Sequence, residues 1–429
     1  MLVHLKTLGC RLNEAETESW ASDFQQLGHQ IVNDESSADV LVINTCAVTQ
    51  SAVRKSRQLI RKLHKKNAQA KLVVSGCYAT LNSEEAVQTD GVDLLVNNQD
   101  KNRLAQLTQQ HLAIESMPVL ATEPNEDALF SRGRQRAFVK VQDGCRYRCS
   151  FCIVTIARGS EKSTPIAKLI DEVNTLGNSG VSEIVITGVH LGGYGSDTDS
   201  NLYQLVSELL DKTDMPRIRM GSLEPWDLPA NFFNLFDNDR LMPHVHLPLQ
   251  SGSDSVLRRM ARRCKTAEFR ELVANARHTV KNLNISTDII VGFPGETEQD
   301  WQQTLDFVKE IGFNHIHIFT YSKREGTKAA TLPDQVDEKI KKARSKQLHL
   351  LAQQQKLAAM AAAQQQTHAV LWEDRQADDQ QGNAVYFGYT PNYLRVKAIV
   401  EPSIDLTNTI TITQVTNMAG NVMDVEVIS

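Results

Sequence analysis

Three cysteines in one short loop constrain this chain more than any other feature. They are Cys145, Cys149 and Cys152, with the spacing C-x3-C-x2-C. Thiolates at short, fixed spacings are the usual ligands of iron–sulfur clusters, and three of them leave one iron of a four-iron cluster open to a substrate. A zinc loop is the alternative interpretation, although zinc sites usually join two C-x2-4-C pairs that lie far apart in sequence.

Apolar strands alternate with helices in the first part of the chain. Strands are predicted at 3–8, 39–44 and 71–75, and helices at 13–27 and 50–66. Near-continuous apolar strands separated by helices are typical of a parallel sheet that is covered on both faces. This part of the chain is therefore predicted to be an open parallel α/β domain.

A cysteine follows each of those three strands, and the three are Cys10, Cys46 and Cys77. In open parallel sheets, ligands bind at the carboxyl ends of the strands, which share one edge. We therefore expect these cysteines to converge there as a second metal site with three thiolates. The alternative is that they are ordinary buried cysteines, which are common in protein cores.

A longer alternation of strands and helices starts at Ala137. Its strands are predicted at 138–141, 184–187, 217–220, 244–247, 285–291 and 315–319. Six βα units predict a partial (β/α)6 barrel, and such barrels place their chemistry at the C-terminal ends of the strands. The loop that begins at Cys145 follows the first of these strands, where this rule expects a functional loop.

The remaining segments differ in character. Residues 111–137 contain two prolines and little periodicity, so they are predicted to be a linker. A single long helix, rich in Lys, Ala, Leu and Gln, is expected at about 334–366. Short strands after residue 366 predict a small β-barrel; they lie at 370–372, 393–396, 409–412 and 422–428.

Composition and charge narrow the class of protein. No run of about 18 apolar residues exists, and Met1–Thr7 lacks the features of a signal peptide. We therefore expect a cytoplasmic protein with no membrane partner, whose seven cysteines stay reduced. The net charge of −5 argues against strong nucleic-acid binding, and no DNA partner is expected. The acidic excess lies after residue 366, however, where the sequence contains eight acidic residues and three basic ones.

Several motifs together resemble the radical S-adenosylmethionine (radical SAM) methylthiotransferases. In addition to the loop at Cys145, they are TLGCRLNE at 7–14, NTC at 44–46, SGC at 75–77, IARG at 156–159, LQSGS at 249–253 and DIIVGFPGE at 288–296. The resemblance covers essentially the whole chain. It implies an N-terminal cluster domain at 1–112, a radical SAM domain at 131–366 and a TRAM domain at 367–429.

Finer features indicate a branch of this family. The residues around Cys10, with YSKREGT at 321–327 and GYTPNY at 388–393, are most similar to the branch that acts on N6-threonylcarbamoyladenosine beside the tRNA anticodon. The branches that act on N6-isopentenyladenosine in tRNA, or on an aspartate of a ribosomal protein, remain open. A rival from another class is a non-catalytic iron–sulfur protein that binds RNA or senses redox state.

The resemblance implies two [4Fe-4S] clusters and S-adenosyl-L-methionine (SAM) as cofactors. The cluster on the loop cysteines would cleave SAM to a radical that removes hydrogen from C2 of the adenine. The cluster on the three N-terminal cysteines would carry the sulfur, which a second SAM methylates. An electron donor such as flavodoxin or ferredoxin is implied. No side chain is assigned a catalytic role, because radical chemistry of this kind belongs to cofactors.

Six residues are predicted to contact SAM. Gly188 ends the second barrel strand, in a loop that resembles the family's SAM-contacting loop. Polar residues at or near strand ends are candidates for the ribose or amino-acid part of SAM, and these are Glu224, Gln250, Ser251 and Asp288. Phe151 precedes the last cysteine of the loop and is a candidate to stack near the adenine; the alternative is that it simply packs the loop.

Contacts with the tRNA anticodon stem-loop are predicted from charge and aromatic residues. Basic residues gather at 54–66 and 132–140, and we expect them to carry most of the phosphate contact. Runs of charge are more often simply solvated surfaces. In the acidic C-terminal part, one local face for base stacking is expected from Tyr386, Phe387, Tyr389 and Tyr393 with Arg395 and Lys397.

Overall fold

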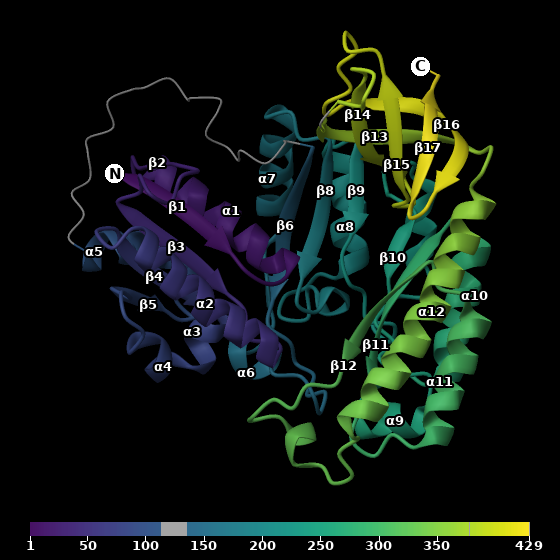
Figure 1. Cartoon of the computed structure of the whole chain (residues 1–429), viewed down its shortest axis with the longest axis horizontal. Helices are drawn as coiled ribbons and strands as arrows, with labels where there is room; N and C mark the ends of the chain where they lie inside the picture. The colour runs from purple at the N-terminus through teal and green to yellow at the C-terminus, as the bar shows by residue number, and fades with distance from the viewer. Residues whose placement is uncertain (113–134, 377, 429) are drawn as a thin grey trace. The chain divides into compact units, whose positions relative to one another are not determined.

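The computed structural model describes residues 1–112, 135–376 and 378–428 (Figure 1). Most of the predicted linker at 111–137 lies outside these residues. The chain forms two compact units. The N-terminal unit contains the described part of 1–132, together with 143–161 and 322–330. The C-terminal unit contains the rest. Among the described helices, none combines the length and apolar character that a membrane crossing requires.

A five-stranded parallel sheet forms the centre of the N-terminal unit, as predicted. Its strands are β1 (Leu2–Thr7), β2 (Gln30–Ile31), β3 (Val40–Thr45), β4 (Lys71–Gly76) and β5 (Leu94–Val96). Their order across the sheet is β2-β1-β3-β4-β5. The central strand β3 is buried along its whole length, which explains its continuous apolar run at 40–43. Strands β2 and β5 were not predicted, because two or three residues show no usable period.

Helices cover both faces of this sheet (Figure 1). The helices of this part are α1 (Arg11–Gln26), α2 (Gln50–Lys66), α3 (Cys77–Leu81), α4 (Ser83–Val87) and α5 (Leu104–His111), with a 3-10 turn at Lys101–Arg103. Side chains of α1 and α5 pack on one face, around Trp20 and Phe24. Those of α2, α3 and α4 pack on the other, around Ile60 and Tyr78. The sheet is thereby packed on both faces, and this packing supports the loops at its edge.

The C-terminal unit contains the predicted six-stranded partial barrel. Its strands are β6 (Arg136–Asp143), β8 (Glu183–Gly188), β9 (Arg217–Met220), β10 (His244–His246), β11 (Asn284–Val291) and β12 (His315–Thr320). A short strand β7 (Lys162–Ser163) flanks β6. Two parallel sheets, one ending at β9 and the other starting at β10, are joined by parallel bridges at Ile218–Leu241 and Ser222–His246.

Helices pack against the outside of these strands in one large apolar core. They are α7 (Ile166–Asn178), α8 (Leu202–Lys212), α9 (Asp254–Arg259), α10 (Thr266–Thr279), α11 (Glu298–Ile311) and α12 (Glu338–Ala362). Helix α11 has clear end signals: Thr297 and Asp300 form a capping box, and Gly312 ends the helix in the left-handed conformation. The long predicted helix is present as α12, somewhat shorter than 334–366.

A closed barrel of five strands ends the chain, as expected of a TRAM domain. The strands are β13 (Thr367–Arg375), β14 (Ala384–Tyr389), β15 (Arg395–Val400), β16 (Ile410–Ala419) and β17 (Val422–Val427). One prediction is wrong here. Tyr386 is only 1% exposed and lies in the barrel core, whereas Phe387 is its neighbour on a strand and points to the opposite side. The expected aromatic face therefore cannot include Tyr386.

Candidate functional site

The three N-terminal cysteines lie at the carboxyl ends of adjacent strands. Cys10 follows β1, Cys46 follows β3 directly, and Cys77 follows β4 directly. Because β1, β3 and β4 are neighbours in the sheet, their ends share one edge. The structure thus places these cysteines at one edge of the sheet. Burial raises the pKa of Cys10 and of Cys46, and the neighbouring Cys77 adds to both shifts.

Two glycines hold these turns against each other. Gly9 has φ +116° and Gly76 has φ +94°, in the region that side chains avoid. A Cβ atom at Gly9 would lie 2.8 Å from Cβ of Cys46, and one at Gly76 would lie 2.3 Å from the carbonyl oxygen of Thr45. Only glycine permits these approaches, which explains why a glycine directly precedes both Cys10 and Cys77 in the sequence.

The chemistry of these thiols suits a bound metal cluster. All seven cysteines of the chain are free of disulfides. Burial raises the pKa of Cys46 to about 11, and Arg158 opposes that shift. The Nδ2 group of Asn98 lies 3.8 Å from Sγ of Cys77, where it can donate to a thiolate. A metal that binds here must therefore displace protons from the thiols, and the nearby cation and amide donor favour the resulting negative charge.

The cysteine loop belongs to the same compact unit as these thiols. The backbone N–H of Cys145 donates to the carbonyl of Gly159 at 3.1 Å, and that of Cys152 to Cys149 at 3.0 Å. The Thr155 hydroxyl donates to the carbonyl of Tyr147 at 2.8 Å. These bonds connect the loop to the short helix α6 (Val154–Arg158), which follows it. The three cysteines of the loop are half-buried. The loop therefore offers soft sulfur donors on a folded, hydrogen-bonded frame.

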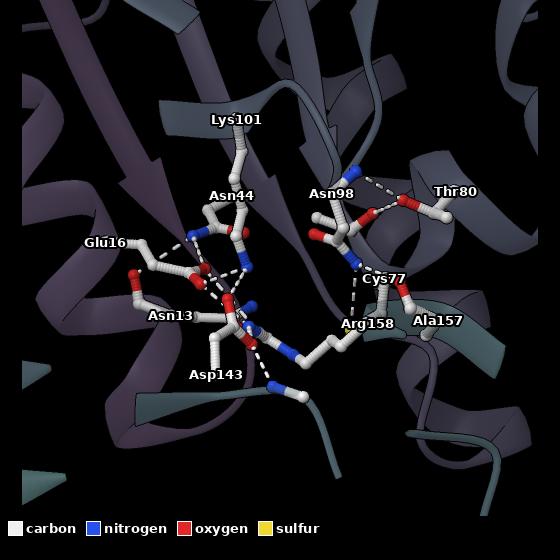
Figure 2. A network of polar contacts seen from close by, with 12 residues as sticks. Asn13, Glu16, Asn44, Cys77, Thr80, Asn98, Lys101, Asp143, Ala157 and Arg158 are labelled. Carbon is white, nitrogen blue, oxygen red and sulfur yellow. Dashed lines mark hydrogen bonds and ion pairs between the residues drawn. The ribbon is translucent and has the colours of Figure 1, made fainter. Parts of the chain in front are cut away.

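A buried polar network in this unit was missed by sequence reasoning (Figure 2). Its charged members are Glu16, Lys101, Asp143 and Arg158. Arg158 lies in a motif that the sequence singled out, but its partners carried no signal. They are common residue types, and they come from distant parts of the chain.

The candidate SAM residues fall into both units. Phe151 lies in the cysteine loop of the N-terminal unit, where it is half-buried. The other candidates lie in the C-terminal unit: Gly188, Glu224, Gln250 and Ser251 lie at or after the carboxyl ends of barrel strands, and Asp288 lies within strand β11. Gly188 ends β8, where a Cβ atom would lie 2.9 Å from the Leu191 side chain. Burial raises the pKa of Glu224, and within the described residues its Oε2 atom has no hydrogen-bond partner. The same atom lies 3.7 Å from Nε2 of His190, and a carboxylate oxygen without a hydrogen bond can still accept one from a ligand.

The remaining three candidates lie around strand β11. Gln250 is a non-glycine residue at φ +78°, and its backbone bonds to Asp288 and Ile290 hold it there. Such backbone strain is often found at functional sites. Ser251 is fully buried, and its hydroxyl bonds that of Thr304 at 3.2 Å, so it supports the loop from within. The carboxylate of Asp288 lies 3.3 Å from the imidazole of His246.

Family models match both units. Residues 2–97 match the uncharacterized protein family UPF0004, and residues 139–308 match the Radical SAM superfamily. Among solved structures, the radical S-adenosylmethionine methyltransferase TsrM from Kitasatospora setae, with cobalamin and a [4Fe-4S] cluster bound, aligns with a TM-score of 0.57 at 14% identity. The alignment covers 77% of each chain. At this identity the likeness supports the fold alone.

Curated relatives match nearly the whole chain. The threonylcarbamoyladenosine tRNA methylthiotransferase MtaB of Bacillus subtilis is 36% identical over 407 residues, which are 92% of this chain and 89% of that protein. The MtaB protein of Aquifex aeolicus is 37% identical, over 83% of this chain and 89% of its own. A tRNA-2-methylthio-N(6)-dimethylallyladenosine synthase of Staphylococcus aureus is 31% identical, over 90% and 77%.

Proposed function

Because the chain belongs to the radical SAM methylthiotransferases, we propose that it adds a methylthio group to C2 of N6-threonylcarbamoyladenosine beside the tRNA anticodon. The observation that carries this proposal is the 36–37% identity to two MtaB proteins over 83–92% of the chain. The dimethylallyladenosine synthase has a lower identity of 31%. The branch motifs around Cys10 and at 321–327 support the same substrate.

We propose distinct roles for the two sets of cysteines. Cys145, Cys149 and Cys152 would hold the cluster that faces SAM, and the N-terminal set of Cys10, Cys46 and Cys77 would hold the cluster that carries sulfur. When bound, these clusters and SAM supply a radical able to break an unactivated C–H bond and the sulfur that replaces the hydrogen. The protein contributes thiolates on two rigid frames and neighbouring donors that favour their negative charge.

SAM would be held by residues at or near the ends of the barrel strands. The buried carboxylate of Glu224 is suited to the ammonium or a ribose hydroxyl of SAM. Gly188 and Gln250 would offer backbone groups to SAM, Asp288 would add a second carboxylate, and Phe151 would stack near the adenine. Ser251 would act indirectly, since its hydroxyl is engaged with Thr304.

The tRNA would contact helix α2. Five of its basic side chains are exposed and have no ion pair within the described residues: Arg54, Lys55, Arg61, Lys62 and Lys65. Arg57 is less available, because it pairs with Glu85 at 2.8 Å. Arg136 is engaged with the buried Glu183, so the expected contribution of the 132–140 group is reduced.

Replacing Arg61 and Lys62 by Gln should weaken tRNA binding and flatten its salt dependence, whereas an unchanged salt slope would exclude α2.

We further propose that the enzyme works in the cytoplasm with a small electron donor such as flavodoxin or ferredoxin. The test of the whole proposal is nucleoside mass spectrometry of tRNA from cells with and without the gene. Loss of the methylthio form of threonylcarbamoyladenosine is expected. Loss of methylthio-isopentenyladenosine, or unaltered tRNA, would overturn the substrate assignment.

Anaerobic reconstitution with SAM and dithionite distinguishes an enzyme from a non-catalytic iron–sulfur protein, since the latter yields no 5′-deoxyadenosine.

A further inference from the structure

The buried network of the N-terminal unit is built around the guanidinium of Arg158, at the end of α6 and six residues beyond Cys152 (Figure 2). Its Nη1 donates to Glu16 at 2.7 Å and to Asp143 at 3.1 Å, and its Nη2 donates to Oδ1 of Asn13 at 2.8 Å. Lys101 bonds the same two carboxylates, at 2.6 Å and 2.5 Å. Two cations and two anions therefore share one closed set of bonds.

One arm of the network reaches the turns that carry Cys10 and Cys46. Asn13 donates through Nδ2 to the carbonyls of Leu8 at 2.7 Å and Thr45 at 3.2 Å. Its Oδ1 atom, which accepts from Arg158, also lies 3.5 Å from Sγ of Cys10. Asn44, two residues before Cys46, donates to both Asn13 and Glu16. A shift of the Arg158 side chain would therefore displace the groups that hold the turns at Cys10 and Cys46.

The other arms reach Cys77 and the cysteine loop. Asn98 donates through Nδ2 to the carbonyl of Ala157 at 2.8 Å, next to Arg158, and the same group lies 3.8 Å from Sγ of Cys77. Asp143 stands two residues before Cys145 and accepts from the backbone of Gly144 at 2.9 Å. Every cysteine-bearing segment of this unit is thus tied to the same few polar groups.

Burial shows that this network is not a set of surface ion pairs. The side chains of Glu16, Lys101 and Arg158 are 1%, 3% and 3% exposed, and that of Asp143 is 17% exposed. Buried ion networks add little stability compared with apolar packing, and their best-attested role is to specify one arrangement. The planar fork of an arginine fixes direction as well as distance, which a lysine cannot do.

We propose that Arg158 and Glu16 are positioning residues that set the separation of the two cysteine sets, and with it the efficiency with which radical formation leads to sulfur transfer. This inference rests on the proposed function. Both sets must serve one adenine, so a displacement of about 1 Å between them would leave SAM cleavage intact while the sulfur misses its carbon.

The test compares three variants of the full-length protein after anaerobic reconstitution. Arg158→Gln removes the charge, and Arg158→Lys keeps the charge but loses the fork. Arg103→Gln is the matched control, because Arg103 lies in the same unit and its side chain is 63% exposed. Iron content and melting temperature are recorded first. The amounts of 5′-deoxyadenosine and methylthio product are then measured in the same reactions with threonylcarbamoylated tRNA.

Arg158→Lys keeps the cation and should bind the full complement of iron. Arg158→Gln removes the cation near the thiols and should bind less iron, but the protein that is reconstituted should still release 5′-deoxyadenosine. Product per 5′-deoxyadenosine should fall about tenfold in Arg158→Gln and less in Arg158→Lys. The magnetic interaction between the two reduced clusters, measured by electron paramagnetic resonance, should change in the same order. The control should match the wild type. If Arg158→Gln fails to bind iron, Arg158→Lys decides alone.

An unchanged product ratio together with an unchanged magnetic interaction in Arg158→Lys or Arg158→Gln would overturn the proposal. Equal losses of product and 5′-deoxyadenosine would do so as well, because they would indicate a general loss of activity. If the wild type itself makes no methylthio product, the proposed function fails. The magnetic measurement still tests the positioning role in that case, because it requires no turnover.

Discussion

Strand β6 contributes to two of the buried ionic networks among the described residues: its first residue, Arg136, to one and its last, Asp143, to the other. In the C-terminal unit, Glu183 is fully buried and pairs with three guanidinium groups, those of Arg136, Arg217 and Arg219. In the N-terminal unit, two cations face two carboxylates among the cysteine-bearing segments.

The surroundings of the two networks differ as much as their charges. Glu183, Arg136 and Arg217 stand at the amino ends of their strands. Arg219 stacks over Tyr393 at 4.5 Å and donates to the carbonyl of Pro391. Tyr393 and Pro391 both lie between strands β14 and β15 of the closed five-stranded barrel, which therefore covers that network. In βα barrels the amino ends of the strands serve stability and the carboxyl ends serve chemistry. The comparison suggests that similar side chains hold the fold together in one place and align cofactors in the other.

The largest effect on stability is expected for Glu183→Gln. It would leave three buried guanidinium groups without their carboxylate, and breaking a buried pair in this way costs about 3–5 kcal/mol. Denaturant unfolding measures the loss, with Asp171→Asn on the exposed side of α7 as the control. A loss below about 1 kcal/mol, in the range of an exposed ion pair, would break the comparison.

Acid should remove the same interaction without a mutation. Although burial acts to raise the pKa of Glu183, Arg219, Arg136 and Arg217 hold it well below the ordinary value of 4.5. A carboxyl group with a lowered pKa contributes stability above its unfolded pKa, and that contribution is lost as the pH falls below about 4.5. The denaturant concentration at the midpoint of unfolding should therefore decline more steeply in the wild type than in Glu183→Gln as the pH is lowered from about 6 to about 3.5. Parallel declines would contradict this.

A smaller effect is expected at the aromatic cover. Tyr393 stacks on Tyr389 at a centroid distance of 4.7 Å and lies beneath Arg219. Tyr393→Leu should lower the free energy of unfolding by about 1–2 kcal/mol, because a desolvated cation–π contact and a ring stack are lost. Tyr393→Phe keeps the ring and is the control. Equal losses in the two variants would assign the effect to the hydroxyl group.

The smallest change in stability is expected at the edge of the N-terminal network. Asn98→Ala removes one hydrogen bond to Ala157 and the donor near Cys77, at a cost of about 1 kcal/mol. Iron bound after reconstitution should nevertheless fall measurably, because the donor favours the thiolate. Thermal melting and iron analysis measure the two effects. Full iron content in Asn98→Ala would show that this donor does not assist the cysteines.

Much of the fold could be predicted because the long strands contain continuous apolar runs, such as 40–43 in β3 and 289–291 in β11. Strand β2 was too short to show a period, and β14 carries aromatic or small residues on both faces, so neither showed alternation. The cysteines stood out through fixed spacing and their place after strands. The network did not, because Glu16 and Arg158 are 142 positions apart and only the folded chain brings them to 2.7 Å.

The most direct test of the central claim measures product per 5′-deoxyadenosine in Glu16→Gln and Glu183→Gln side by side. Each variant removes one buried carboxylate, and the assay is run below both unfolding transitions. We predict that the ratio falls about tenfold in Glu16→Gln and keeps its wild-type value in Glu183→Gln, even if Glu183→Gln is the less stable protein. Equal ratios in the two variants would contradict the assignment of one network to alignment and the other to stability.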